Sequence, residues 1–133
     1  MLIQEHGYAL PVSKALIAIL KTQLESIENS PSAFVVLNFR DPDYSPLRGG
    51  YHPVEIAVDG QGRIQYLTDF AYVGRGDGAE LAKELDFDFA LGLFQHLGRE
   101  FPIHRGRGLF KLWQSNFVSY YQGGVYDVDM VRC

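Results

Sequence analysis

The stretch HPVEIAVDGQGRIQYLTDFAYV, residues 52–73, decides the fold class of this chain. Within residues 51–58, two sets of side chains alternate along the chain. One set is His52, Val54, Ile56 and Val58, and the other is Tyr51, Pro53, Glu55 and Ala57. This period of two is typical of a strand with one face toward a core. The sequence DGQG at residues 59–62 is a strong hairpin-turn signal, and residues 63–73 form the returning strand. The stretch therefore predicts two antiparallel strands joined by a tight turn.

The returning strand is apolar on both faces. One face carries Ile64, Tyr66, Phe70 and Tyr72, and the other carries Leu67, Ala71 and Val73. Two helices cover only one face of such a sheet. We therefore expect a loop, a partner subunit or a ligand to shield part of the other face. The aromatic residues Tyr66, Phe70 and Tyr72 are candidates for a binding surface there.

The remaining elements lie outward from this hairpin in both directions. The patterns predict helices at residues 12–28 and 109–122, strands at 33–39, 86–93 and 125–131, a short helical segment at 79–85, polar connections at 40–50 and 99–108, and a glycine-rich loop at 74–78. The predicted fold class is α+β, in the order α-β-β-β-(α)-β-α-β. We expect a single domain with a mostly antiparallel sheet of about five strands and two main helices.

Composition and charge limit the function classes. The 133 residues are 47% hydrophobic and 21% charged, which fits one globular domain and excludes a disordered or coiled-coil chain. The net charge of −4 argues against a protein that binds nucleic-acid phosphates. The only cysteine, Cys133, excludes an internal disulfide. Without a secretion signal or a membrane-spanning segment in the sequence, we expect a cytoplasmic protein that does not associate with membranes.

The densest group of polar side chains surrounds the long connection. Its members are Arg40, Asp41, Asp43, Tyr44, His52 and Glu55, together with Asp69 on the returning strand. In one interpretation the two aspartates of the connection, His52 and Glu55 bind a metal ion or form an acid/base set. However, the spacing matches no metal motif, and His52 points to the face opposite Glu55. We therefore favour a turn ordered by its aspartate side chains, and we assign no metal ligand and no cofactor.

Arg40 is expected to pair with a carboxylate. Asp69 lies on the Leu67 face of a strand that is apolar on both sides, where a lone carboxylate is costly to bury. A guanidinium beside it would make that burial tolerable. The candidate partners of Arg40 are Asp43, Asp69 and Glu55.

Basic residues gather just before the second helix. Arg105 and Arg107 lie in the sequence HRGRG, residues 104–108, which suits a phosphate-binding loop. With the aromatic sheet face, this loop would suit single-stranded nucleic acid. Because the chain is acidic overall, we favour two solvated patches of opposite charge instead, this basic one and the acidic stretch at residues 77–88.

No catalytic set can be assigned from the sequence. It contains no recognisable Ser-His-Asp or Cys-His arrangement, and a cysteine at the chain end is poorly placed for nucleophilic catalysis. Asn116 falls on the apolar face of the second helix, where we expect its amide to be a buried structural link.

Several segments together resemble a known family. They are LPVS at residues 10–13, NFRDPDYS at 38–45, GGYHPVEI at 49–56, TDF at 68–70 and QSNF at 114–117. In these segments the chain is similar to the bacterial family called domain of unknown function 2787, over nearly its whole length. The resemblance implies a small intracellular bacterial protein and supplies no activity, cofactor or catalytic residue. It makes residues 40–55 the first place to look for a site.

The leading hypothesis for function is a non-enzymatic module that binds another protein or forms a homo-oligomer. It rests on the two-faced aromatic strand, the opposed charge patches and the lack of a catalytic set, and tyrosine-rich surfaces suit recognition. The alternative is a metal-dependent or carboxylate-based enzyme that uses the cluster at residues 40–55. Single-stranded nucleic-acid binding is the third and least favoured hypothesis.

Overall fold

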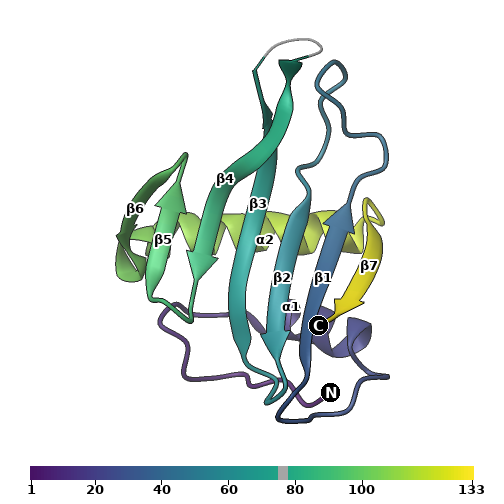
Figure 1. Ribbon diagram of the computed structural model, residues 1–133, viewed down its shortest axis with the longest axis vertical. Coiled ribbons are helices and arrows are strands. Elements are labelled where there is room, and N and C mark those ends of the chain that lie inside the picture. The colour runs from purple at the N-terminus through teal and green to yellow at the C-terminus, as the bar shows by residue number, and fades with distance from the viewer. Residues whose placement is uncertain (75–77) are drawn as a thin grey trace.

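The computed structural model describes residues 1–74 and 78–133 as an antiparallel sheet with two α-helices (Figure 1). The elements are α1 (Lys14–Gln23), β1 (Phe34–Arg40), β2 (Val54–Asp59), β3 (Ile64–Val73), β4 (Glu80–Asp88), β5 (Leu93–His96), β6 (Arg99–Pro102), the 3-10 helix η2 (Ile103–Gly106), α2 (Arg107–Gln122) and β7 (Asp127–Arg132). The α+β class, the antiparallel sheet and the two main helices are therefore confirmed.

The sheet has seven strands, in the order β6-β5-β4-β3-β2-β1-β7, so the expectation of about five was wrong. Each strand from β1 to β5 pairs with the next one along the chain, and β7 returns after α2 to pair with β1. The predicted hairpin is the β2–β3 pair at the middle of this sheet.

Three local predictions fail. The strand predicted at residues 86–93 is divided, because β4 ends at Asp88, a turn occupies residues 89–92 and β5 begins at Leu93. In the other two cases, pairing with neighbouring strands overrides local preference. Residues 79–85 contain good helix formers, yet β4 runs through them and pairs along β3 from Val73–Glu80 to Tyr66–Asp88. The predicted connection at residues 99–108 contains the edge strand β6 and η2. Of the predicted glycine-rich loop, residues 75–77 lie outside the described part of the chain.

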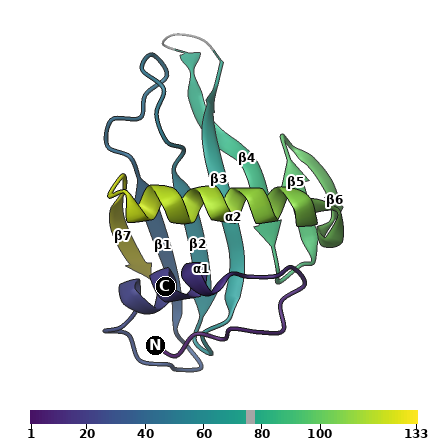
Figure 2. The ribbon, with the colours of Figure 1, turned by 180° about the vertical axis from the view of Figure 1, so that it is seen from behind.

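Both α-helices lie on one face of the sheet, and α2 crosses the strands (Figure 2). Helix α1 begins after Ser13, whose side chain accepts a hydrogen bond from the Leu16 backbone N–H, a standard N-cap. The core fills the space between the two layers. Its members include Val35, Leu37 and Phe39 of β1 and Phe110, Trp113 and Phe117 of α2.

The opposite face of the sheet carries no helix of the described chain (Figure 1). In β1, buried and partly exposed residues alternate, so Val36 and Asn38 lie on this uncovered face. Residues paired across an antiparallel sheet share a face, which places Tyr66 and Thr68 of β3 there as well.

Candidate functional site

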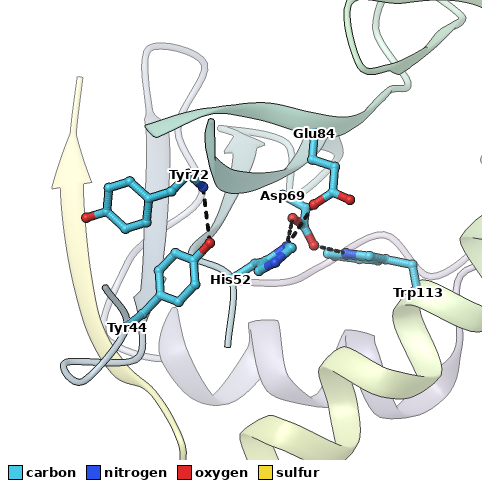
Figure 3. A network of polar contacts seen from close by, with 6 residues as sticks. All are labelled: Tyr44, His52, Asp69, Tyr72, Glu84 and Trp113. Atoms are coloured by element: carbon cyan, nitrogen blue, oxygen red, sulfur yellow. Dashed lines mark hydrogen bonds and ion pairs between the residues drawn. The ribbon is translucent and has the colours of Figure 1, made fainter. Parts of the chain in front are cut away.

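A cluster of three titratable side chains lies where the start of β2 meets the middle of β3 and β4, on the helix side of the sheet (Figure 3). His52 precedes β2, Asp69 lies in β3 and Glu84 lies in β4. The His52 Nδ1 atom is 2.8 Å from Asp69 Oδ1 and 2.9 Å from Glu84 Oε2. One ligand atom from each residue lies within 4.8 Å of the other two. We call these three residues the His52 cluster.

Glu84 reaches the cluster because of an irregularity in the sheet. Asp69 pairs with Leu85, whereas Phe70 pairs with Lys83, so Glu84 is the extra residue of a β-bulge. A bulge turns one side chain out of strict alternation. In a regular strand Glu84 would face away from Leu85, but here its carboxylate joins Asp69 on the helix side.

Asp69 is fully hydrogen-bonded although it is only 9% exposed. Its Oδ1 atom pairs with His52, and its Oδ2 atom accepts a hydrogen bond of 3.0 Å from the indole N–H of Trp113 on α2 (Figure 3). A buried carboxylate needs such donors, because it loses the water that would otherwise solvate it. Asp69 therefore links a central strand to both the loop before β2 and the covering helix.

The histidine shares one nitrogen between two carboxylates. The hydrogen bond with Asp69 raises the pKa of His52 above the ordinary value for histidine, and burial of the ring opposes that rise. Only Asp69 is hydrogen-bonded to Nδ1, because a single nitrogen carries at most one proton. The Oε2 atom of Glu84 is buried and has no hydrogen-bond partner in the described part of the chain.

A pocket of about 220 Å³ lies beside the cluster. Its lining combines His52 and Asp69 with Gly50, Tyr51, Val54, Trp113, Asn116, Phe117, Tyr120 and Tyr126. The rings of Tyr51 and Tyr120 pack 4.6 Å apart between centroids. The expectation for Asn116 was wrong, since this residue is exposed and its position is at the pocket rather than in the core.

The metal or acid/base set considered from the sequence does not assemble. Asp41 orders the loop, since its two oxygens accept hydrogen bonds from the backbone N–H groups of Asp43 and Tyr51. Gly50 is required beside it, because a Cβ there would lie 2.8 Å from the carboxylate of Asp41 and its φ is +132°. These contacts fit the favoured interpretation of an aspartate-ordered turn.

Glu55 lies on the face opposite His52, as predicted, and accepts a hydrogen bond from Tyr66. Tyr44 packs between His52 and Tyr72, with ring centroids 5.5 and 5.1 Å away, and accepts a hydrogen bond from the Tyr72 backbone N–H. Among the described residues, the His52 cluster is the one group of three such ligands that converges.

Arg40 does not form the predicted pair. It is exposed, and within residues 1–74 and 78–133 it makes no ion pair with Asp43, Asp69 or Glu55. The prediction that Asp69 needs a partner was sound, but His52 and Trp113 meet that need. The Trp113 contact had a signal in the sequence, since a buried indole N–H requires an acceptor.

The uncovered face carries a second arrangement of polar residues. The cross-strand register aligns one residue from each of the seven strands, which we call the acidic row: Asp129, Asn38, Glu55, Thr68, Asp86, Gln95 and Glu100, from β7 to β6. A carboxylate therefore occurs on every second strand across the sheet. No sequence pattern reveals this row, because its members are far apart in the chain.

Hydroxyl groups hold two carboxylates of the acidic row in place. Tyr66 donates to Glu55 at 2.5 Å, and Thr68 donates to Asp86 at 2.8 Å. Burial raises the pKa of Asp86 above the usual carboxyl range, although the Thr68 hydrogen bond opposes this. Burial and the contact with Glu55 raise the pKa of Tyr66.

The candidate binding surface from the sequence is divided between the two sides of the sheet. Tyr66 and Phe70 lie on the uncovered face, and Tyr72 follows on the same side of β3. Arg105, in η2, packs over the ring of Phe101. Phe101 pairs with the buried Phe94, so it lies on the helix side of the sheet. Arg107 is the first residue of α2, which lies on the same side. The combined surface of aromatic residues and arginines proposed for nucleic acid is therefore not formed.

Comparisons with known proteins identify the family. The profile described as "Protein of unknown function (DUF2787)" matches residues 14–131, so the chain belongs to this family. No curated protein matches the chain. In the described residues, no helix has the length and apolar character needed to cross a membrane.

Two solved structures from Vibrio cholerae are similar over almost the entire chain. The hypothetical protein VC0508 of the VSP-II pathogenicity island is 37% identical, with a TM-score of 0.82 and coverage of 96% of this chain and 99% of that one. The conserved hypothetical protein VC1805 of pathogenicity island VPI-2 is 38% identical, with a TM-score of 0.81 and coverage of 95% and 98%. That protein is described as sharing structural homology with the human P32 protein.

Proposed function

We propose that this member of the DUF2787 family is a non-enzymatic protein-binding module. Its uncovered sheet face would bind a positively charged segment of another protein. The observation that carries the proposal is the acidic row, which runs across all seven strands on a face that no helix of the described residues covers.

Charge complementarity selects the chemistry of the partner. The uncovered face carries the acids Glu55, Asp86, Asp88, Glu100, Asp127 and Asp129 against the bases Arg40 and Lys83. Such a face repels nucleic-acid phosphates and repels the same face of a second copy. A basic protein segment is attracted to it, and the half-buried rings of Tyr66 and Phe70 add apolar contact area.

The spacing of the acidic row selects the shape of the partner. Neighbouring strands lie about 4.8 Å apart, so carboxylates on alternate strands are about 10 Å apart. Residues i and i+7 of an α-helix lie on one side of that helix and are about 10.5 Å apart along its axis. A helix with a basic residue at every seventh position, lying across the strands as α2 does on the other face, therefore matches the row (Figure 2).

The test uses designed peptides as probes. An alanine-based helical peptide with lysine at every seventh position is titrated into the protein at low salt and at physiological salt. A peptide of the same composition, with its lysines distributed around the helix, is the matched probe. We expect the first peptide to bind more tightly, and a single-stranded oligonucleotide not to bind.

Protein variants show whether the binding uses the acidic row. The double variant Glu55→Gln/Asp129→Asn removes two charges of the acidic row. It should weaken peptide binding about tenfold, because each exposed ion pair with a lysine contributes up to about 1 kcal/mol. The matched control is Glu25→Gln/Glu28→Gln, which changes the net charge by the same amount at exposed positions after the end of α1. This control should leave peptide binding unchanged. Equal losses in both double variants, or equal affinity for the two peptides, would exclude the proposed face.

A further inference from the structure

We propose that the His52 cluster is a binding site for one divalent transition-metal ion, with Zn²⁺ the cation that it fits best. The site goes beyond the proposed function, since it lies on the helix side of the sheet and uses none of the acidic row. Its ligand atoms would be Nδ1 of His52, a carboxylate oxygen of Asp69 and Oε2 of Glu84.

Two of the three distances between the donor atoms are close to those around a bound metal ion, and the third is no more than 4.8 Å. Zn²⁺ lies about 2.0–2.2 Å from nitrogen and oxygen ligands, so two ligands at octahedral or tetrahedral angles are about 3.0–3.4 Å apart. The Nδ1 atom of His52 is 2.8 Å from Asp69 Oδ1 and 2.9 Å from Glu84 Oε2. An increase of a few tenths of an ångström would bring these two distances to the values around an ion.

The charge of the cluster also favours a bound cation. Asp69 and Glu84 bring two carboxylates together, and in residues 1–74 and 78–133 neither forms an ion pair with a lysine or arginine. A protonated His52 balances one of the two negative charges. A divalent ion balances both and lets the imidazole bind in its neutral form, which is the form that coordinates metals.

Glu84 provides an independent observation in favour of a ligand. Its Oε2 atom is buried, accepts no hydrogen bond from the described residues, and lies toward Nδ1 of His52. Buried carboxylate oxygens are normally satisfied by donors, and an unsatisfied one calls for an explanation such as an ion. The single proton of Nδ1 cannot serve both carboxylates, whereas a metal ion bonds to all three groups at once.

The surroundings have the two features expected of a metal site with an open coordination position. Trp113 donates to the outer oxygen of Asp69 and fixes the carboxylate, as hydrogen bonds behind metal ligands do. The pocket of about 220 Å³ borders His52 and Asp69 and has room for water or a small ligand. One nitrogen and two carboxylates suit Zn²⁺ better than Mg²⁺ or Ca²⁺, which prefer oxygen ligands alone.

The competing explanation is a protonated His52 that bridges the carboxylates without any metal. The two explanations are separated by titrating Zn²⁺ into the metal-free full chain, without a histidine tag, by isothermal calorimetry. Every sample carries Cys133→Ser, which removes an exposed thiol that would itself bind zinc. We expect one ion bound per chain, weaker binding of Mg²⁺ and Ca²⁺, and a higher melting temperature with Zn²⁺.

The decisive variant is Glu84→Gln, which keeps the shape of the side chain and removes its charge. We expect at least a tenfold loss of Zn²⁺ affinity, together with an unchanged or higher melting temperature without metal, because the unsatisfied charge is gone. Glu80→Gln, at an exposed position in the same strand, is the matched control and should bind Zn²⁺ as the parent does. His52→Gln should also lose at least tenfold in affinity.

The proposal is overturned if Zn²⁺ does not bind with one-to-one stoichiometry. It is also overturned if Glu84→Gln and His52→Gln bind Zn²⁺ as tightly as Glu80→Gln. Binding of Mg²⁺ or Ca²⁺ as tight as that of Zn²⁺ would overturn the assignment of the ion. None of these outcomes depends on the peptide experiments.

Discussion

The two faces of this sheet treat their carboxylates differently. On the covered face, Asp69 is nearly enclosed and receives hydrogen bonds at both oxygens, from His52 and from Trp113. On the uncovered face, Glu55 and Asp86 each receive one hydroxyl hydrogen bond and keep contact with solvent. A carboxylate under the helices must be satisfied by the protein, whereas one on the open face can remain available to a partner.

The largest effect is expected from removing the side chain that covers Asp69. Trp113→Ala should lower the free energy of unfolding by about 3–5 kcal/mol, because it opens a cavity beside Phe117 and removes one donor from a buried carboxylate. Urea unfolding followed by circular dichroism measures this. Leu112→Ala, at an exposed position on the same helix, should cost less than about 1 kcal/mol. Similar losses in the two variants would mean that Trp113 contributes no more to stability than an exposed residue of the same helix.

A second prediction concerns the hydrogen bonds of Asp69 themselves. Asp69→Asn should lower the free energy of unfolding by about 2–3 kcal/mol, because a neutral amide replaces the charged acceptor that strengthens the hydrogen bonds with His52 and Trp113. The double variant with Trp113→Phe should lose less than the sum of the two single variants, since they share one hydrogen bond. Additivity within about 0.3–0.5 kcal/mol would show that this bond contributes little.

Arg40 tests the uncovered face with a smaller effect. Because this residue is exposed and unpaired among the described residues, Arg40→Ala should change the free energy of unfolding by less than about 1 kcal/mol. The same variant should strengthen binding of the lysine peptide, since it removes a positive charge from the acidic face. A loss of stability of about 3 kcal/mol or more would reveal a buried pair instead.

Asp86 gives the smallest effect and a pH dependence of definite sign. Since burial raises its pKa in the folded state, the folded protein favours the protonated form, and ionisation at neutral pH reduces stability. Asp86→Asn should therefore be as stable as the parent at pH 7 or more stable by up to about 0.5 kcal/mol, because Thr68 can still donate to the amide oxygen.

The measurement for Asp86 is urea unfolding at pH 7 and at pH 4. The advantage of the variant should shrink at the lower pH, where the parent begins to protonate and relieves its own penalty. An advantage that grows as the pH falls would contradict the raised pKa of this carboxyl group.

Prediction from the sequence was reliable for the central hairpin and for the environment of Asp69. The alternation at residues 51–58 located β2 and correctly separated His52 from Glu55, and the apolar strand with one acid predicted that Asp69 needs a partner. The identity of that partner was missed, because Trp113 is 44 residues further along the chain. Glu84 was missed because no local pattern reveals a bulge that changes which way a side chain faces.

The sequence by itself determined the class of the fold, the central hairpin and the two helices, since period-two and helical spacings are properties of neighbouring residues. Tertiary structure alone decided that residues 80–85 belong to strand β4, because pairing with β3 outweighs their preference for helix. It also decided the two sites. The acidic row requires the register of all seven strands, and the His52 cluster requires a bulge opposite Asp69. Register and bulges depend on contacts between distant segments, so only the assembled sheet brings these carboxylates together.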